Sequence, residues 1–373
     1  MHLIRYATVV FCLLHQAVWA ENNLPRECLL DLQALPAFIL NNDAGGKDIF
    51  QEKGEFYFST ALQKSEQEIA SVMSSNDCQS VLSDYLRAWR KGHLEIDTLE
   101  TVHNTDNLKD NADSQSKPNP KPEINFLSTK TLVLRLPDFL PENRQPLIDL
   151  LESHRKKLKR IPNWIIDVRG NGGGADSSYK PLLPWILENE TQDIGASWLA
   201  TPDNIKGQRS LCARFAPGDA HCISSLEEAA TRMESKPMGS FVPQGDGPLI
   251  TYSAAEKHPH PKRVALVIDR GCGSSCEEFV LKLRQSFNVK TIGTRTHGSL
   301  DYSNMRSYLL PSGKRELWYA TSRSNRLPDF KVDGGGIMAD IYFPVPKGEK
   351  GKTLYLRHIK NWLEGGSLAA DNY

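Results

Sequence analysis

The sequence lacks an excess of charge of either sign. Its 373 residues carry 45 lysines and arginines against 45 aspartates and glutamates, so the formal net charge is zero. Proteins that bind nucleic acids usually carry a basic excess, and we therefore expect no nucleic-acid partner. Hydrophobic residues make up 39% and charged residues 24%, which is typical of a soluble globular protein rather than a disordered chain.

Long hydrophobic runs are also scarce. Only residues 1–20 have the features of a targeting segment: Arg5 precedes the apolar run 7–14, and residues 18–20 place small side chains at the two positions that a signal peptidase reads. The run is too short to span a bilayer of about 30 Å, so a cleaved secretory signal fits better than an anchor. We expect a secreted or periplasmic protein without a membrane span.

Cysteines are few, but their number becomes even once the signal is removed. The six that remain are Cys28, Cys78, Cys212, Cys222, Cys272 and Cys276. An even count in an exported chain indicates disulfides, and we favour the pairs Cys28–Cys78 and Cys212–Cys222. A bond between Cys272 and Cys276, four residues apart at a helix start, is geometrically possible but would be strained. For these two we favour a structural bond with some partner over a redox role.

Apolar periodicity divides the chain into two parts and a linker. Helical spacing predicts an N-terminal helical domain over 21–103, and the polar, proline-rich segment 104–124 is typical of a linker. Strands alternating with helices over 125–365 predict an α/β domain. An insertion at about 193–260 interrupts it, where short strand signals are broken by glycine and proline.

The α/β part has a regular series of predicted elements. Strands are expected at 131–136, 164–168, 262–268 and 289–292, two more flank the turn 311–314, and helices are expected at 141–160, 177–188 and 274–286.

The strongest candidate site follows the predicted strand 262–268. Residues 269–278 read Asp-Arg-Gly-Cys-Gly-Ser-Ser-Cys-Glu-Glu, so Ser274 stands where a glycine-rich turn enters a helix. Free backbone N–H groups at a helix start can hold a developing oxyanion, and the glycines leave the hydroxyl open to substrate. Serine is also a common helix N-cap, so the motif alone does not establish a nucleophile.

A second glycine-rich turn follows the predicted strand 164–168. Residues 167–174 read Asp-Val-Arg-Gly-Asn-Gly-Gly-Gly, a spacing that matches neither of the common phosphate-binding glycine motifs. Such a run can instead present one free backbone N–H to a carbonyl oxygen of a substrate.

Together and in this order, the two turns resemble those of the tail-specific (C-terminal processing) serine peptidases, especially the branch that includes the tricorn core protease. That family has an Asp-Leu/Val-Arg-x-Asn-x-Gly-Gly strand end followed by a Ser-Ala-Ser-Glu-type turn, and an Ile-Gly-Thr-Arg-Thr-His-Gly stretch follows here at 292–298. The likeness covers about 131–346 and, more faintly, the helical region through His93. It implies a ClpP/crotonase-like α/β core and an exported serine peptidase that acts on a peptide or protein substrate.

The family pattern, carried over position by position, assigns the nucleophile and the oxyanion hole. It makes Ser274, three residues before Glu277, the nucleophile, and Ser275 supplies one amide. The second amide comes from Gly172 or Gly173, and both alternatives stay open.

The residue that would act as catalytic base differs from that in the main branch of the family. Where that branch has its lysine, this chain has Ser299, so the usual Ser–Lys dyad is absent. The tricorn-like branch takes its base from an upstream Gly-His motif, which offers His93, and its acid from a position that corresponds to Asp333. These would form a Ser–His–acid relay. His297 is the alternative base, and a carboxylate beside a glycine turn is commonly only a turn former.

Three further expectations complete the sequence-based account. The 37 residues between His93 and Thr131 are too few for the PDZ domain of well-known members. We expect no cofactor and no metal, since His258 and His260 stand in a proline-rich loop without further ligands at metal spacing. The alternative function is a non-catalytic binding protein on the same scaffold, and the sequence does not indicate an oligomeric state.

Overall fold

The structure is a computed structural model, and it describes residues 23–99, 119–247, 249–253, 261–346 and 349–368. The predicted signal segment 1–20 and most of the predicted linker 104–124 lie outside these ranges, so both stay predictions.

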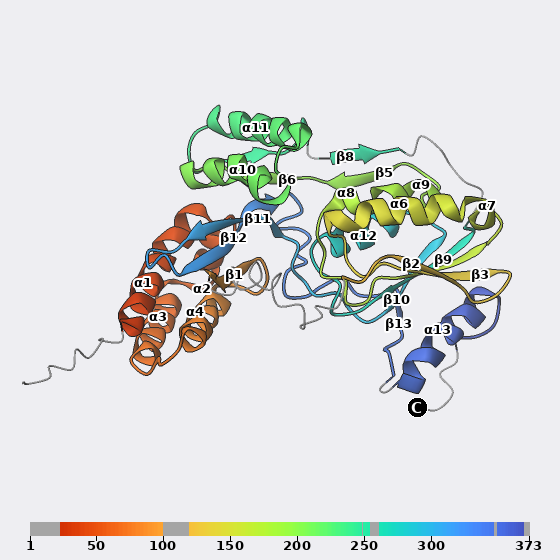
Figure 1. The fold of residues 1–373 in the computed structure, drawn as a ribbon, viewed down its shortest axis with the longest axis horizontal. Helices are drawn as coiled ribbons and strands as arrows, with labels where there is room; N and C mark the ends of the chain where they lie inside the picture. Colours follow the sequence, from red (N-terminus) through yellow and green to blue (C-terminus); the bar gives the residue numbers. More distant parts are fainter. Residues whose placement is uncertain (1–22, 100–118, 248, 254–260, 347–348, 369–373) are drawn as a thin grey trace, which may run out of the picture.

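Four helices form one end of the molecule (Figure 1): α1 (Leu24–Asn42), α2 (Gly46–Lys53), α3 (Glu55–Ile69) and α4 (Ser75–Trp89). A capping box starts α4, since the Ser74 side chain accepts from the Asp77 N–H. The disulfide Cys28–Cys78 joins α1 to α4, as the sequence predicts. The predicted N-terminal helices are therefore confirmed, but they end at Trp89, and residues 94–98 of the predicted helical domain form a strand.

A six-stranded sheet forms the other end, with the order β13-β10-β9-β4-β3-β2. Its strands are β2 (Glu123–Phe126), β3 (Thr131–Arg135), β4 (Asn163–Asp167), β9 (Arg263–Ile268), β10 (Val289–Gly293) and β13 (Ile341–Tyr342). All neighbours are parallel except β2 and β3. The predicted α/β architecture is confirmed.

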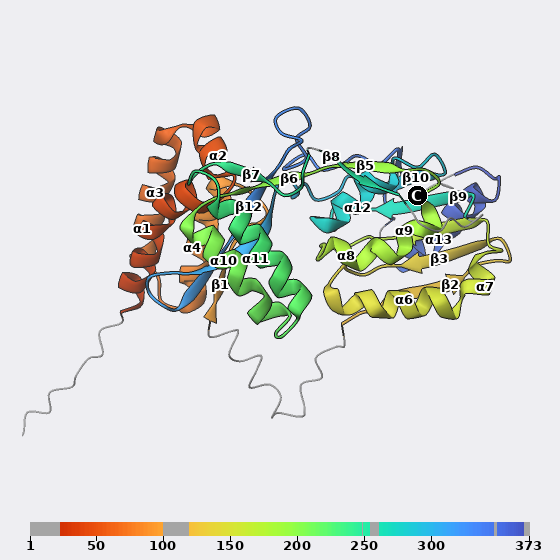
Figure 2. The same ribbon diagram turned by 90° about the horizontal axis from the view of Figure 1, so that it is seen from above.

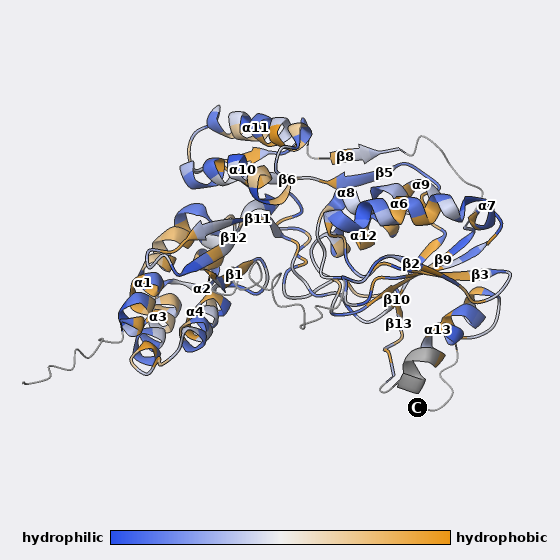
Figure 3. Cartoon of the chain, in the orientation of Figure 1, coloured by the Kyte–Doolittle hydropathy of each residue, from blue (hydrophilic) through white to orange (hydrophobic). Residues whose placement is uncertain are grey.

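Helices cover both faces of this sheet (Figures 1 and 2). Its inner strands β3, β4 and β9 are buried on both sides, which explains why they are mostly apolar (Figure 3). One face is covered by the helix after Ser274 and by the segments predicted as helices over 141–160 and 177–188, each of which is divided into shorter helices. The other face is covered by the C-terminal helix. The bounds are η1 (Pro141–Asn143), α6 (Arg144–Ser153), α7 (Arg155–Leu158), α8 (Asp176–Tyr179), η2 (Lys180–Leu182), α9 (Leu183–Ile186), α12 (Ser275–Leu283) and α13 (Glu349–Leu363).

A second, antiparallel sheet connects the two ends. It consists of β1 (Leu94–Thr98), β6 (Ala196–Leu199), β7 (Phe241–Pro243), β11 (Tyr302–Leu309) and β12 (Arg315–Ser324). Leu317 and Tyr319 of β12 are buried in the same core as the helices α1–α4. The helices α1–α4 and the strand β12 thus share one hydrophobic core. The predicted linker is therefore not the only connection between the two ends.

The insertion differs from the prediction. Besides the strand pair β5 (Thr191–Ile194) and β8 (Leu249–Tyr252), it holds two helices, α10 (Pro202–Phe215) and α11 (Ala220–Glu234), where only short strands were expected. The cap residues Thr201 and Asp219 start these helices, and the predicted disulfide Cys212–Cys222 joins them. Across the described ranges no helix is long and apolar enough to cross a membrane.

Candidate active site

The two glycine-rich turns lie side by side because they follow neighbouring parallel strands. β4 and β9 pair in register, so their carboxyl ends meet at one edge of the sheet. Asp269 joins the turns: its Oδ1 accepts from the N–H groups of Gly170 at 2.8 Å and Gly271 at 2.9 Å. Gly273 adds a third link, since its N–H donates to the Asn171 carbonyl at 3.1 Å.

Ser274 occupies a strained position at the end of this turn. Its φ of 56° and ψ of −125° are unfavourable for a residue with a Cβ, and such strain is kept where the surroundings fix it. The half-buried side chain stands directly before α12, whose first residue is Ser275. The sharp strand-to-helix turn therefore presents the hydroxyl at a helix N-terminus.

Glu277 holds this turn in place. Its fully buried carboxylate accepts from the N–H groups of Ser274 at 3.2 Å, Gly298 at 2.8 Å and Ser299 at 2.8 Å, and from the Thr296 hydroxyl at 2.5 Å. One carboxylate thus ties the turn that contains Ser274 to the segment 296–299. From the sequence, Glu277 served only to locate Ser274 three residues before it. The Ser-x-x-Glu spacing of a capping box was the signal for this wider role.

Two backbone N–H groups of these turns have no acceptor among the described residues. The N–H of Ser275 begins α12, where no intrahelical acceptor exists. Gly173 approaches so closely that a Cβ there would lie 2.8 Å from the Ser274 Cβ, but its N–H already donates to Asn171 Oδ1 at 2.9 Å. The Gly172 N–H has no acceptor among the described residues. Of the two predicted glycines, Gly172 therefore retains the free donor.

His93 reaches this region from the turn after α4. A Cβ on Gly92 would lie 2.6 Å from the Ser299 Cβ, so the Gly-His turn packs directly on the position where the main branch has its lysine. His93 Nδ1 donates to the Tyr302 carbonyl at 2.6 Å, which leaves Nε2 as the basic nitrogen. The buried ion pair of Arg90 with Asp43 supports the turn, since Arg90 also donates to the His93 carbonyl at 2.7 Å.

Burial dominates the electrostatics of His93. It lowers the pKa of the imidazole to about 4, and the neighbouring charge of Arg90 acts in the same direction. His93 is therefore neutral at physiological pH, as a general base must be.

The alternative base, His297, also lies beside the turn that contains Ser274. Its backbone N–H donates to the Cys272 carbonyl at 2.8 Å, and its imidazole Nδ1 is 3.1 Å from the Ser299 hydroxyl. A Cβ on Gly273 would lie 3.3 Å from the His297 Cβ. Its side chain is exposed, so the structure brings both candidate bases together but encloses only His93.

Asp333 does not contact either histidine through a hydrogen bond in the described structure. Its Oδ1 instead accepts from the N–H groups of Leu300 at 2.6 Å and Asp301 at 2.7 Å, and burial raises its pKa to about 6. These bonds fix the segment that ends in the Tyr302 carbonyl. The Tyr302 carbonyl thus holds the imidazole where the family pattern implies a carboxylate. Asp333 is connected to the imidazole only through the backbone of residues 300–302.

The cysteines that flank Ser274 are bonded to each other. Cys272 and Cys276 form a disulfide with a Cα–Cα distance of 5.4 Å, and both are fully buried. A structural bond was expected, but its partner was not identified. The bond closes a short loop that contains Ser274.

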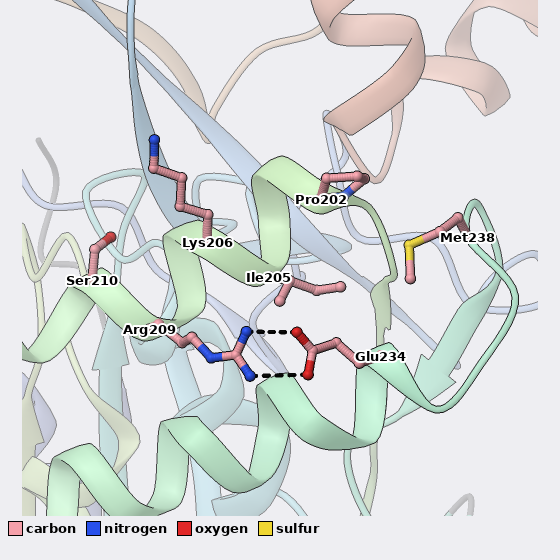
Figure 4. Close-up of a pocket in the computed structure, with 7 residues that line it drawn as sticks. All are labelled: Pro202, Ile205, Lys206, Arg209, Ser210, Glu234 and Met238. Atoms are coloured by element: carbon pink, nitrogen blue, oxygen red, sulfur yellow. Dashed lines mark hydrogen bonds and ion pairs between the residues drawn. The ribbon is translucent and has the colours of Figure 1, made fainter.

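Other candidate sites are less well equipped. A cavity of about 590 Å³ in the insertion lies between α10 and the end of α11 (Figure 4), where Arg209 is paired with Glu234. It contains no predicted site residue. No three His, Cys, Asp or Glu side chains in the described ranges are grouped as metal ligands.

Comparisons with known proteins bear on the family and the fold of the chain. The model of peptidase family S41 matches residues 130–342, which is more than half of the chain. No curated protein sequence matches.

Three solved structures show the same fold over nearly the whole chain. A CPAF mutant has a TM-score of 0.64 at 12% identity, covering 92% of this chain and 99% of that one. Mature CPAF complexed with lactacystin has a TM-score of 0.62 at 11% identity, with coverages of 91% and 98%. A lipoprotein from Streptococcus agalactiae has 0.51 at 16% identity, with 91% and 97%. The predicted ClpP/crotonase-like core with N-terminal helices is confirmed.

Proposed function

Because the chain belongs to peptidase family S41, we propose that it is an exported serine peptidase that hydrolyses peptide bonds, with Ser274 as nucleophile and His93 as base. The observation that carries this proposal is the position of the Gly-His turn. It packs on Ser299 beside the nucleophile turn, with His93 held by the Tyr302 carbonyl.

The proposed chemistry uses groups of this chain alone. His93 Nε2 takes the proton of the Ser274 hydroxyl while Oγ attacks the peptide carbonyl, and the N–H groups of Ser275 and Gly172 stabilise the oxyanion. His93 then returns the proton to the leaving amine, and water releases the acyl group by the same steps. Asp333 is a positioning residue in this scheme, since it acts through the backbone that ends at Tyr302.

Three features support a branch of the family and a cellular location for this proposal. Ser299 replaces the lysine of the Ser–Lys dyad, which supports the tricorn-like branch. The short segment between His93 and Thr131 leaves no room for a PDZ domain, so docking of substrate tails by that route is not part of the proposal. Three disulfides support an extracytoplasmic location.

Hydrolysis of a peptide library tests the proposal. Ser274→Ala should abolish cleavage without loss of the fold, whereas Ser275→Ala, the matched control, should keep much of it because its role uses the backbone N–H. If folded wild-type protein cleaves no peptide, the non-catalytic binding protein is the better account. If Ser275→Ala is the inactive variant, the assigned nucleophile is wrong by one position.

A further inference from the structure

A cavity of about 580 Å³ lies between the helical end and the α/β core and borders the candidate active site. His297 lines it directly. Gly92 and Gly334, the chain neighbours of His93 and Asp333, line it as well. A peptide bound across Ser274 therefore has an adjoining space into which a side chain or a chain end can extend.

Positive charge gathers around this cavity. Arg87, Arg90 and Lys91 contribute from the end of α4 and the turn after it, and Arg270 and Arg295 contribute from the α/β core. Among the described residues that line the cavity, Glu95 is the one carboxylate. The chain as a whole carries equal numbers of cations and anions, so this excess is local.

Two of these cations are already neutralised. Arg90 is buried against Asp43, and Arg87 forms an ion pair with Asp84. In the described part of the chain, no carboxylate pairs with the other three.

The three remaining cations come from different segments of the chain. Lys91 and Arg270 are exposed, and among the described residues the Arg295 guanidinium donates only to the Gly335 carbonyl, at 3.2 Å. Unpaired cations that converge on one concave space raise the local concentration of anions, and guanidinium groups match carboxylates in a two-pronged geometry.

We propose that this cavity is a specificity subsite that binds a carboxylate of the peptide substrate, held by Lys91, Arg270 and Arg295. The inference rests on the proposed peptidase function and names its substrate class: peptides that present negative charge close to the scissile bond. The carboxylate can belong to a Glu or Asp side chain or to the substrate's C-terminus.

Matched peptides test the subsite and separate the two sources. A cleaved library peptide is made with Glu, Gln or Lys at each position near the scissile bond, and each version carries a free or an amidated C-terminus. At low salt, kcat/KM should fall about tenfold from Glu to Gln at one position, and further for Lys. If amidation, rather than Glu→Gln exchange, causes the loss, the C-terminal carboxylate is the ligand. Equal kcat/KM for every version would overturn the subsite.

Charge reversal tests the residues. The variant Arg270→Glu/Arg295→Glu should lose the preference for the carboxylate and gain one for Lys, mainly through KM. Lys156→Glu on the exposed surface of α7, outside the cavity, is the matched control and should keep the wild-type preference. An unchanged preference in the double variant would contradict the assignment.

An uncharged fluorophosphonate probe distinguishes failure of the subsite from failure of the proposed function. The probe reacts with an activated serine and does not need the cavity. Labelled protein without any charge preference overturns only the subsite, whereas folded protein that neither labels nor cleaves overturns the peptidase function itself.

Discussion

At the scale of single residues, His93 is set apart by the surroundings of its imidazole. A carbonyl holds Nδ1, and burial lowers the pKa to about 4. A protonated imidazole cannot accept the serine proton, so activity is lost below this pKa and is present above it. We predict that kcat/KM, which reports the free enzyme, rises with pH through about 4.

An unperturbed histidine would instead give a rise between about 6 and 7.5, which is what the sequence alone predicts. A pH profile of kcat/KM for wild type decides between the two.

His93→Ala should reduce turnover at least about a hundredfold, a typical general-base contribution, and His297→Ala should reduce it less. A near-normal His93→Ala variant would contradict the relay.

Asp333 permits a test of direct against indirect action. If it acts by accepting the Leu300 and Asp301 N–H groups, Asp333→Asn should keep most of kcat, because an amide oxygen can accept the same bonds. Asp333→Ala should lose much more. A carboxylate that stabilised the imidazolium itself would make Asp333→Asn lose on the order of ten-thousandfold in kcat.

The positions of some candidate site residues could be predicted from the sequence, and those of others could not. Ser274 and the glycine turns are readable because the chemistry and the turn geometry both restrict residue type locally. The contact of His93 with the Tyr302 carbonyl is not, because any residue supplies a carbonyl. The indirect position of Asp333 follows from the same backbone contact and was missed for the same reason.

At the scale of elements, the turn from β9 into α12 is held by a disulfide within it. The disulfide Cys272–Cys276 spans Ser274, and the Cys272 carbonyl also accepts the His297 N–H. We predict that replacing both cysteines with alanine lowers kcat by about ten- to hundredfold, because small displacements of a nucleophile are costly. KM should change less.

Removal of the other short-range disulfide is the matched control. Cys212→Ala/Cys222→Ala breaks a bond within the insertion, between α10 and α11, and should leave kcat close to wild type. If both double variants lose activity equally, the bond around Ser274 has no special positioning role and the loss reflects stability alone.

The elements themselves were predictable where burial leaves a pattern. Strands β4 and β9 are buried on both faces, so they appear in the sequence as continuous apolar runs. Helix α10 buries the polar Asn204 and Gln208 beside Ile205 and Cys212, so it lacks the apolar period that would have identified it. Its cap, Thr201 before Pro202, was the remaining signal.

At the scale of the whole molecule, the candidate site is assembled from both ends of the protein. Ser274 belongs to the α/β core and His93 to the helical end, but β12 packs its apolar side chains among α1–α4 and pairs with β1. The two ends are thus joined by a hydrophobic core and not by a linker alone. The expectation of an α/β core with N-terminal helices was correct, whereas this joining sheet depends on pairings between distant segments that local patterns do not contain.

The identity of the nucleophile can be tested by labelling the folded protein with a fluorophosphonate probe and locating the covalent adduct by mass spectrometry. One adduct is expected, on Ser274, and it should be present in Ser275→Ala and absent in Ser274→Ala. An adduct on another serine, or a folded wild-type protein that forms none, would contradict it.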